Sequence, residues 1–214
     1  MKNRPNPRND LSEALAHRWS FKNGSLVDSV GGLTAVTNGA VDLEDGAVRL
    51  KGLARGQSCV NLGTTLLPTN GFGATIELWV TPLTYKSWAR VIAFGSGTGT
   101  SKDIYLSFNN GKSTADALSH FRIYGSGTDV YATTTAMPPG RTYHVAIVLD
   151  PQLDGRFLNT AYISDAATGE LLEAIQEASN VGWTPAEVAQ TNGCWLGHSH
   201  STSDVDPDAR YALV

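Results

Sequence analysis

The segment "TIELWVTPLTYKSWARVIAFG", residues 75–95, gathers side chains that suit a ligand-binding surface. Glu77 and Trp79 are two positions apart, so a strand would place them on one face, opposite an alternating apolar face. Trp88 and Arg90 follow closely. Aromatic rings stack on the apolar faces of sugars, and charged groups bond to sugar hydroxyls. The segment therefore predicts a carbohydrate-binding face.

Later segments extend this face when they are read with the same period of two residues. The complete set of candidate carbohydrate-binding residues is Trp79, Trp88, Arg90, Tyr105, Arg122, Tyr124, Glu77 and His144. They form one surface only if their strands belong to one sheet. In the alternative interpretation the face is covered, Glu77 forms a structural ion pair with Arg90 or Arg122, and Trp79 serves packing.

Catalysis by this set would need a second carboxylate. Retaining glycosidases place two carboxylates about 5 Å apart. Glu77 has Thr75 and Trp79 at the neighbouring positions of its face, so the partner would have to come from Asp103 or a loop. The chain also has no nucleophile-elbow sequence, and its glycine-rich stretch "GSGTGTSK" lacks the ending of a phosphate-binding loop. A non-catalytic role is therefore expected, with a polysaccharide-active hydrolase or lyase as an alternative.

Metal chemistry is suggested by three aspartates in "STSDVDPDAR". Asp204, Asp206 and Asp208 alternate in an expected loop and offer the hard oxygen ligands that Ca²⁺ prefers. The glycine and glutamate of an EF-hand loop are absent. His198 and His200, just upstream, allow a transition-metal site that would rest on two residues. A solvated loop without metal is the alternative.

The composition limits the class of protein. The chain has 214 residues, 41% of them hydrophobic, which suits one domain with a real core. A net charge of −4 gives no reason to expect nucleic acid or an anionic membrane as partner. No apolar run approaches the roughly 18 residues of a membrane span. Cys59 and Cys194 match no metal-binding spacing; they form a disulfide if their strands meet, or are two small buried residues.

Short apolar-alternating segments separated by turn signals such as "TNGA", "EDGA" and "LDGR" indicate an all-β sandwich or barrel. A short helix is expected in "GWTPAEVAQ", and one helical turn in "LSEALA". The expected strands are His17–Phe21, Leu33–Val36, Val48–Leu50, Cys59–Leu62, Ala74–Pro82, Ala89–Phe94, Asp103–Asn109, His120–Tyr124, Val130–Thr134, Thr142–Leu149, Leu158–Ile163, Leu171–Ile175 and Gly193–Gly197.

Five motifs, taken in order, resemble the laminin-G-like, concanavalin A-like jelly-roll family. They are "HRWSFKNGSLVDSVGGLTA", "SCVNLGTTLLP", "ATIELWVTPLTYKSWARVIAFG", "RTYHVAIVLD" and "NGCWLGHS", and they span about His17 to Asp208. The resemblance implies a two-sheet antiparallel β-sandwich of jelly-roll type. Domains of this family often hold a calcium ion at the rim of the sandwich, so the resemblance also points to calcium as a candidate ligand. It does not select one function, because such domains serve lectin-like binding, adhesion and spacing.

The chain departs from the family at its end. A last strand of the type acidic-x-Phe/Val-Arg-Ile-Tyr is expected after "WLG", but the chain ends in "DPDARYALV". "YALV" is either a shortened last strand, or that strand is missing and another chain supplies it. An open strand position exposes unpaired backbone groups and favours pairing between chains.

Together these observations predict a flexible lead-in at residues 1–12 and a laminin-G-like domain at residues 13–214. The leading functional prediction is a non-catalytic carbohydrate-binding or adhesion module of a larger secreted or surface protein, with a cytoplasmic location as the alternative. The partner would be a glycan or another protein chain. The second interpretation is an assembly module that forms homo-oligomers through the open strand position.

Overall fold

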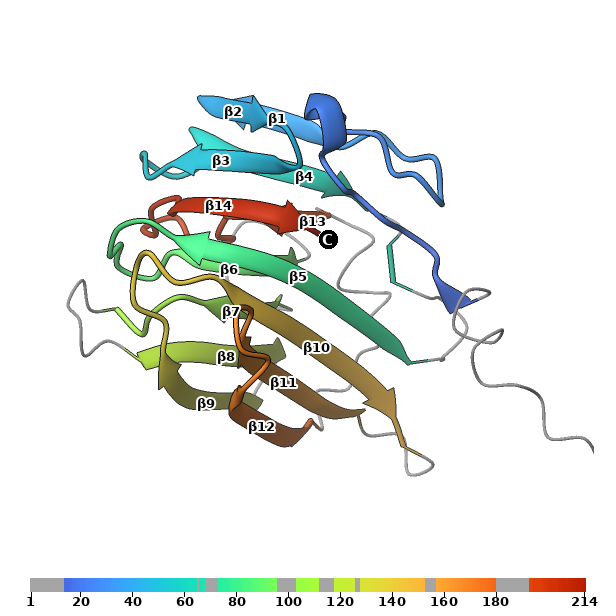
Figure 1. The fold of residues 1–214 in the computed structure, drawn as a ribbon. Coiled ribbons are helices and arrows are strands. Elements are labelled where there is room, and N and C mark those ends of the chain that lie inside the picture. Colours follow the sequence, from blue (N-terminus) through green and yellow to red (C-terminus); the bar gives the residue numbers. More distant parts are fainter. Residues whose placement is uncertain are drawn as a thin grey trace, which may run out of the picture.

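The computed structural model describes residues 14–64, 66–67, 73–95, 103–111, 118–125, 128–152, 157–179 and 193–214. Two antiparallel seven-stranded sheets pack face to face, which confirms the predicted β-sandwich (Figure 1). A single 3₁₀ turn, η1 (Lys22–Gly24), precedes the strands. Within this described part of the chain, no helix is long and apolar enough to cross a membrane.

We call the first sheet the β5 sheet. Its order is β12 (Leu171–Ser179), β11 (Phe157–Asp165), β10 (Tyr143–Pro151), β5 (Ala74–Pro82), β14 (Asp208–Leu213), β3 (Ala47–Lys51) and β2 (Val41–Glu44). We call the second the β6 sheet. Its order is β1 (Val36–Gly39), β4 (Ser58–Gly63), β13 (Cys194–Leu196), β6 (Arg90–Gly95), β7 (Asp103–Ser107), β8 (Leu118–Gly125) and β9 (Thr128–Ala136).

The core lies between the two sheets and follows the alternation in the sequence. Leu78 and Val80 of β5 are fully buried, as is Ile147 of β10. Ile92 and Phe94 of β6 meet them from the other sheet as members of the same apolar cluster. The alternate residues of β5 point outward and are partly or fully exposed. The period of two residues therefore assigned the inner face of β5 correctly.

The structure differs from the predicted elements in three places. The strand expected at Leu33–Val36 does not form: Thr34 makes one isolated bridge to Val27, and β1 begins only at Val36. Residues 17–21 do not form a strand, because Phe21 takes a left-handed conformation with φ of 53° before the 3₁₀ turn. Trp19 nevertheless exchanges two backbone hydrogen bonds with Val214. The edge strand β2 was missed because its sequence, "VDLE", is half acidic. The helix expected in "GWTPAEVAQ" and most of the turn expected in "LSEALA" lie outside the described residues.

The position of the last strand decides between the alternatives for the chain end, in favour of a strand formed by this chain. β14 pairs with β3 on one side and with β5 on the other, in the middle of the β5 sheet (Figure 1). Ala209 and Tyr211 point into the core and are completely buried. The chain therefore fills this position with its own C-terminal residues, and the proposed oligomerisation through an open strand loses its structural basis.

Asp28 fastens the N-terminal segment to the sandwich. Its carboxylate accepts hydrogen bonds from the His17 ring at 2.6 Å, the Arg18 N–H at 2.7 Å and the Val30 N–H at 2.9 Å. Burial alone would raise the pKa of Asp28, but these hydrogen bonds, with one from Gly31, lower it to about 2. The segment around Trp19 is thus held by an ionised, buried carboxylate.

Both cysteines are free buried thiols rather than a disulfide. Burial raises the pKa of Cys59 to about 12, with the nearby Asp206 carboxylate acting in the same direction. Burial also raises the pKa of Cys194 well above its ordinary value. Without a bound metal ion, both thiols are therefore protonated at neutral pH.

Removal of residues 208–214 should abolish cooperative unfolding, because β3 and β5 would each lose the strand that bonds to their backbone. Circular dichroism during urea titration measures this. The peptide "DARYALV" added in trans should restore part of the transition. Arg210→Ala, on the outer face of β14, is the control and should change the free energy of unfolding by less than about 1 kcal/mol. A truncated chain that still unfolds cooperatively would contradict the central role of β14.

Asp28→Asn should lower the free energy of unfolding at pH 7 by about 1–3 kcal/mol, because the amide replaces a charged acceptor of several hydrogen bonds. The pKa of Asp28 is lower in the folded than in the unfolded chain, so its contribution is complete above about pH 4 and is lost as the pH falls through about 2. The stability difference between wild type and variant, measured by urea unfolding, should shrink over this range. Glu170→Gln, an exposed change of the same kind, should be neutral throughout.

Candidate functional site

The predicted carbohydrate-binding residues lie in two different sheets, which corrects the expectation of one common face. Glu77 and Trp79 on β5 and His144 on β10 belong to the β5 sheet. Arg90 on β6 and Tyr105 on β7 belong to the β6 sheet. The outer faces of a sandwich point in opposite directions, so these two groups cannot contact one ligand together.

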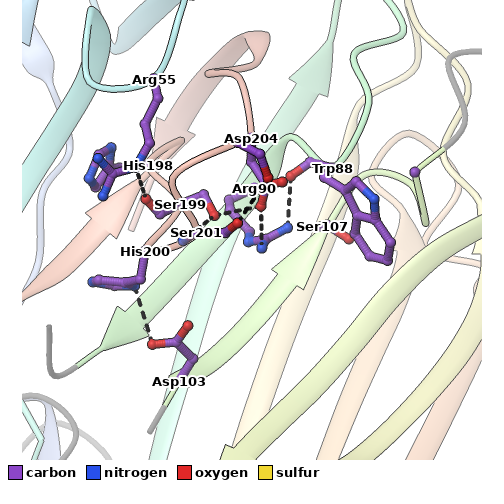
Figure 2. A network of polar contacts seen from close by, with 12 residues as sticks. Arg55, Trp88, Arg90, Asp103, Ser107, His198, Ser199, His200, Ser201 and Asp204 are labelled. Atoms are coloured by element: carbon purple, nitrogen blue, oxygen red, sulfur yellow. Dashed lines mark hydrogen bonds and ion pairs between the residues drawn. The ribbon is translucent and has the colours of Figure 1, made fainter. Parts of the chain in front are cut away.

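The β6-sheet group is buried beneath the segment that links β13 to β14. Arg90 is 3% exposed and donates hydrogen bonds of 2.7 Å to the Asp204 carboxylate and to the Trp88 carbonyl (Figure 2). Its guanidinium carbon lies 3.8 Å from the centroid of the Tyr105 ring. The Ser199 hydroxyl donates to the same Asp204 oxygen at 2.7 Å. Arg90 and Tyr105 are therefore internal and already engaged, rather than open to a ligand.

Trp88 stands at the edge of this covered region. It is half-buried, and its backbone takes a positive φ of 54°, which is rare for a large side chain. The Asn109 side chain holds this conformation by accepting the Trp88 N–H at 2.8 Å. The indole crosses Gly111 so closely that a Cβ there would lie 2.5 Å from its nitrogen. The ring is thus fixed by its own loop.

Strand register extends the β6-sheet group to β8. Tyr105 is paired with Arg122, and Asp103 is paired with Tyr124. The predicted residues on β6, β7 and β8 are therefore neighbours in one sheet, as the sequence indicated for these three strands. Contact of this group with a sugar stays a prediction.

The same covered region holds His200 and Asp103. Each is 3% exposed or less, and the His200 Nδ1 lies 3.5 Å from the Asp103 carboxylate (Figure 2). Burial lowers the pKa of His200 to about 4, and the neighbouring His198, Arg90 and Arg55 lower it further. These effects outweigh the attraction of Asp103, so the imidazole is neutral at pH 7. The Arg55 Nε donates to the Ser199 carbonyl at 2.8 Å and so ties the region to the loop before β4 (Figure 2).

The β5-sheet group is accessible. The rings of Trp79 and His144 are stacked across the strands with centroids 4.3 Å apart. The His144 Nε2 lies 3.3 Å from the Glu77 carboxylate, and the side chains of His144 and Glu77 are 30% and 53% exposed. The structure therefore brings three of the predicted residues together where a solute can reach them.

Tyr162 belongs to the same outer face and was missed by the sequence analysis. Ala146 on β10 is paired with Glu77 on one side and with Tyr162 on β11 on the other. Because Ala146 is small, its position on the outer face is lower than that of its two neighbours, Glu77 and the half-buried Tyr162. The period of two residues, applied to "FLNTAYISD", would have placed Tyr162 outward.

A groove with a volume of about 940 Å³ borders β5. Its lining includes Glu77, Trp79 and Asp150 from β5 and β10, the segment 14–19 and Val214. Its apolar lining includes Leu66 and the core residues Ile92 and Phe94, so the groove reaches the edge of the core between the sheets. An accessible aromatic ring beside a carboxylate, over an apolar floor, suits a ligand with both hydroxyl groups and apolar faces. We call this feature the β5 groove.

The three aspartates predicted to bind calcium have three different partners. Asp204 is paired with Arg90. Asp206 accepts the Gly56 N–H at 3.0 Å and the Ser58 N–H at 2.7 Å. Asp208, on β14, lies 3.7 Å from the Arg49 guanidinium. The carboxylates do not converge on one point in the structure, and calcium binding by them stays a prediction.

A different set of potential ligands meets at Asp206. Its carboxylate, the Cys59 thiol and a ring nitrogen of His198 all lie within 4.8 Å of one another. Within the described ranges, this is the one group of three or more such side chains close enough to share a metal ion. Sequence spacing could not reveal it, because Cys59 is far from the other two residues along the chain.

Three solved structures illustrate the likeness to known proteins, and the first of them supports the fold. The sialidase from Trypanosoma rangeli, solved with 2,3-difluorosialic acid, matches with a TM-score of 0.56 at 11% identity, over 92% of this chain and 29% of that chain. This chain thus spans less than a third of the sialidase. The carbohydrate recognition domain of Emp47p matches with a TM-score of 0.45 at 10% identity, over 88% and 92% of the two chains. The alginate lyase Aly36B has a TM-score of 0.42 at 15% identity, over 81% of each chain.

Comparison with protein families identifies one match. Residues 54–193 fit the model of the concanavalin A-like lectin/glucanases superfamily, whereas no curated protein sequence gives a significant match. The matched region covers more than half of the chain and includes β5 and β10, which carry Glu77, Trp79 and His144. The chain therefore belongs to the concanavalin A-like lectin/glucanases superfamily.

Proposed function

We propose that this domain is a non-catalytic carbohydrate-binding module of a larger secreted or surface protein, and that the β5 groove is its binding site. The observation that carries the proposal is the accessible group of Trp79, Glu77 and His144: Trp79 and Glu77 line this groove, and His144 contacts both of them. The Trp79 ring offers apolar contact to a sugar face. The Glu77 carboxylate and the His144 ring offer hydrogen bonds to hydroxyls.

The accessibility of the two groups favours the β5 groove over the face of the β6 sheet. Arg90 and Tyr105 are each 3% exposed or less, and breaking the buried Arg90–Asp204 pair to reach a ligand would cost about 3–5 kcal/mol. Glu77 and His144 need no such rearrangement. Binding to a preformed groove also avoids the cost of ordering a loop.

The surroundings of Glu77 favour binding over hydrolysis. Its neighbours on the same face of β5 are Thr75 and Trp79, and its partner on β10 is Ala146. None of these supplies the second carboxylate that a retaining or inverting glycosidase needs. His144 is the described hydrogen-bond partner of Glu77, so the pair suits recognition of hydroxyl groups.

Trp79→Ala should weaken binding to the best polysaccharide or oligosaccharide ligand by about tenfold or more, which corresponds to about 1.4 kcal/mol of lost stacking and burial. Glycan-array screening followed by isothermal titration calorimetry measures this. Trp88→Ala, which removes a tryptophan from the loop between β5 and β6, is the matched control and should leave the affinity within about twofold. Loss of binding in Trp88→Ala with normal binding in Trp79→Ala would place the site on the β6 sheet instead.

Incubation of the protein with alginate, β-glucans and sialylated glycans should release no new reducing ends by hydrolysis, because the described neighbours of Glu77 on β5 and β10 include no second carboxylate. A non-catalytic module should also release no unsaturated sugars from alginate. Reducing-end assays and ultraviolet absorbance at the wavelength of unsaturated uronates measure the two reactions. Turnover by the wild type that disappears in Glu77→Gln would show that the domain is a polysaccharide-active enzyme.

A further inference from the structure

Cys59, His198 and Asp206 come together because two strands and a linking segment meet at one end of the sandwich. Cys59 lies on β4, and β4 pairs with β13 so that Val60 faces Leu196. His198 follows β13 by two residues, which brings it alongside Cys59. Asp206 precedes β14 and returns to the same place, where its carboxylate is bonded to the backbone next to Cys59.

Asp206 is a fully buried carboxylate with fixed orientation. Its two oxygens accept the N–H groups of Gly56 and Ser58, and its exposed fraction is zero. Among the described residues, no lysine or arginine lies within ion-pair distance of it, whereas Asp204 two positions earlier is paired with Arg90. Burial of a carboxylate is costly unless hydrogen bonds or an opposite charge compensate for the lost water, and a metal ion can supply that charge.

His198 presents an unsatisfied nitrogen to this carboxylate. Its Nδ1 is buried without a hydrogen-bond partner and lies 3.9 Å from the Asp206 Oδ1. The ring is held in place by Trp195, whose centroid lies 4.7 Å away. A buried polar atom without a partner is rare in folded proteins, and an ion is one of its ordinary explanations.

The donor set and its spacing fit zinc. Sulfur and imidazole nitrogen are poor ligands for calcium or magnesium, but cysteine, histidine and aspartate are all regular zinc ligands. Zinc–ligand bonds of about 2.0–2.3 Å in a tetrahedron place the ligand atoms roughly 3.3–3.7 Å apart. The His198 Nδ1 and the Asp206 Oδ1 are 3.9 Å apart, and all three ligand atoms lie within 4.8 Å of one another, so the cluster must contract by up to about 1 Å to reach this range.

We propose that Cys59, His198 and Asp206 form a structural Zn²⁺ site. The ion binds the Cys59 sulfur as thiolate, with its proton released to solvent, together with the His198 Nδ1 and one Asp206 oxygen. A water molecule completes the tetrahedron. The ion fastens β4 to the segment between β13 and β14, and thereby stabilises the region that covers Arg90 and Tyr105. This inference does not depend on the proposed carbohydrate binding.

Metal content and cobalt substitution test the proposal on the full chain. Protein purified from zinc-supplemented medium should contain about one zinc per chain by inductively coupled plasma mass spectrometry. After chelation, Co²⁺ should give the near-ultraviolet charge-transfer band of a cobalt–thiolate bond, and Zn²⁺ should abolish that band. Zinc should also raise the melting temperature, whereas the same concentration of Ca²⁺ should not.

Matched variants distinguish the cluster from other sites. Cys59→Ala should lose the cobalt–thiolate band and lower the zinc content at least tenfold, whereas Cys194→Ala, which removes the other buried thiol, should keep both. His198→Gln, a milder change at a partly exposed position, should weaken zinc binding while the far-ultraviolet circular dichroism stays unchanged. Wild-type protein that shows neither a cobalt–thiolate band nor bound zinc would overturn the proposal. Equal loss in Cys194→Ala would overturn it too.

Discussion

The insertion of β14 between β3 and β5 is the constraint on which the rest of the structure depends. In the described strand pairings β3 and β5 do not bond to each other, so β14 joins the two halves of the β5 sheet. The Tyr211 hydroxyl on this strand donates to the Arg90 carbonyl at 3.1 Å, and so connects the two sheets through the core. The sandwich is therefore completed only when the last residues of the chain pair with strands formed much earlier, which makes folding dependent on non-local contacts.

The β5 groove lies at one end of β14, and the covered region of the β6 sheet lies at the other end. The pairing of β14 with β5 ends at Trp79, and Val214 continues to Trp19, so the β5 groove begins where the strand stops. At the other end, the segment that leads into β14 crosses the β6 sheet and carries Asp204 to Arg90 and Asp206 to Cys59. The strand β14 thus borders the β5 groove at one end, and the segment that leads into its other end covers Arg90 and Tyr105.

The inner and outer faces of single strands could be predicted from the sequence, but the assignment of strands to sheets could not. The alternation in residues 74–82 correctly placed Leu78 inside and Trp79 outside. The same rule says nothing about partners, because pairing is decided by residues far apart in the chain. Trp79 and Arg90 are close in sequence, yet the chain passes from one sheet to the other between them. The residues predicted to share one face therefore form two groups: the group on the β5 sheet is accessible to solvent, and Arg90 and Tyr105 on the β6 sheet are buried.

Pairing between distant strands also decides the partners of the aspartates and cysteines, which local sequence could not predict. Asp204, Asp206 and Asp208 alternate as ligands of one ion would, but the segment crosses between sheets, so each carboxylate meets a different partner. The two cysteines are alike in sequence as small, isolated and apolar residues. Pairing of β4 with β13 places Cys59 beside an imidazole and a carboxylate, whereas Cys194 lies within the apolar core. The chemical difference between two identical side chains is therefore a property of strand register, which no local sequence pattern encodes.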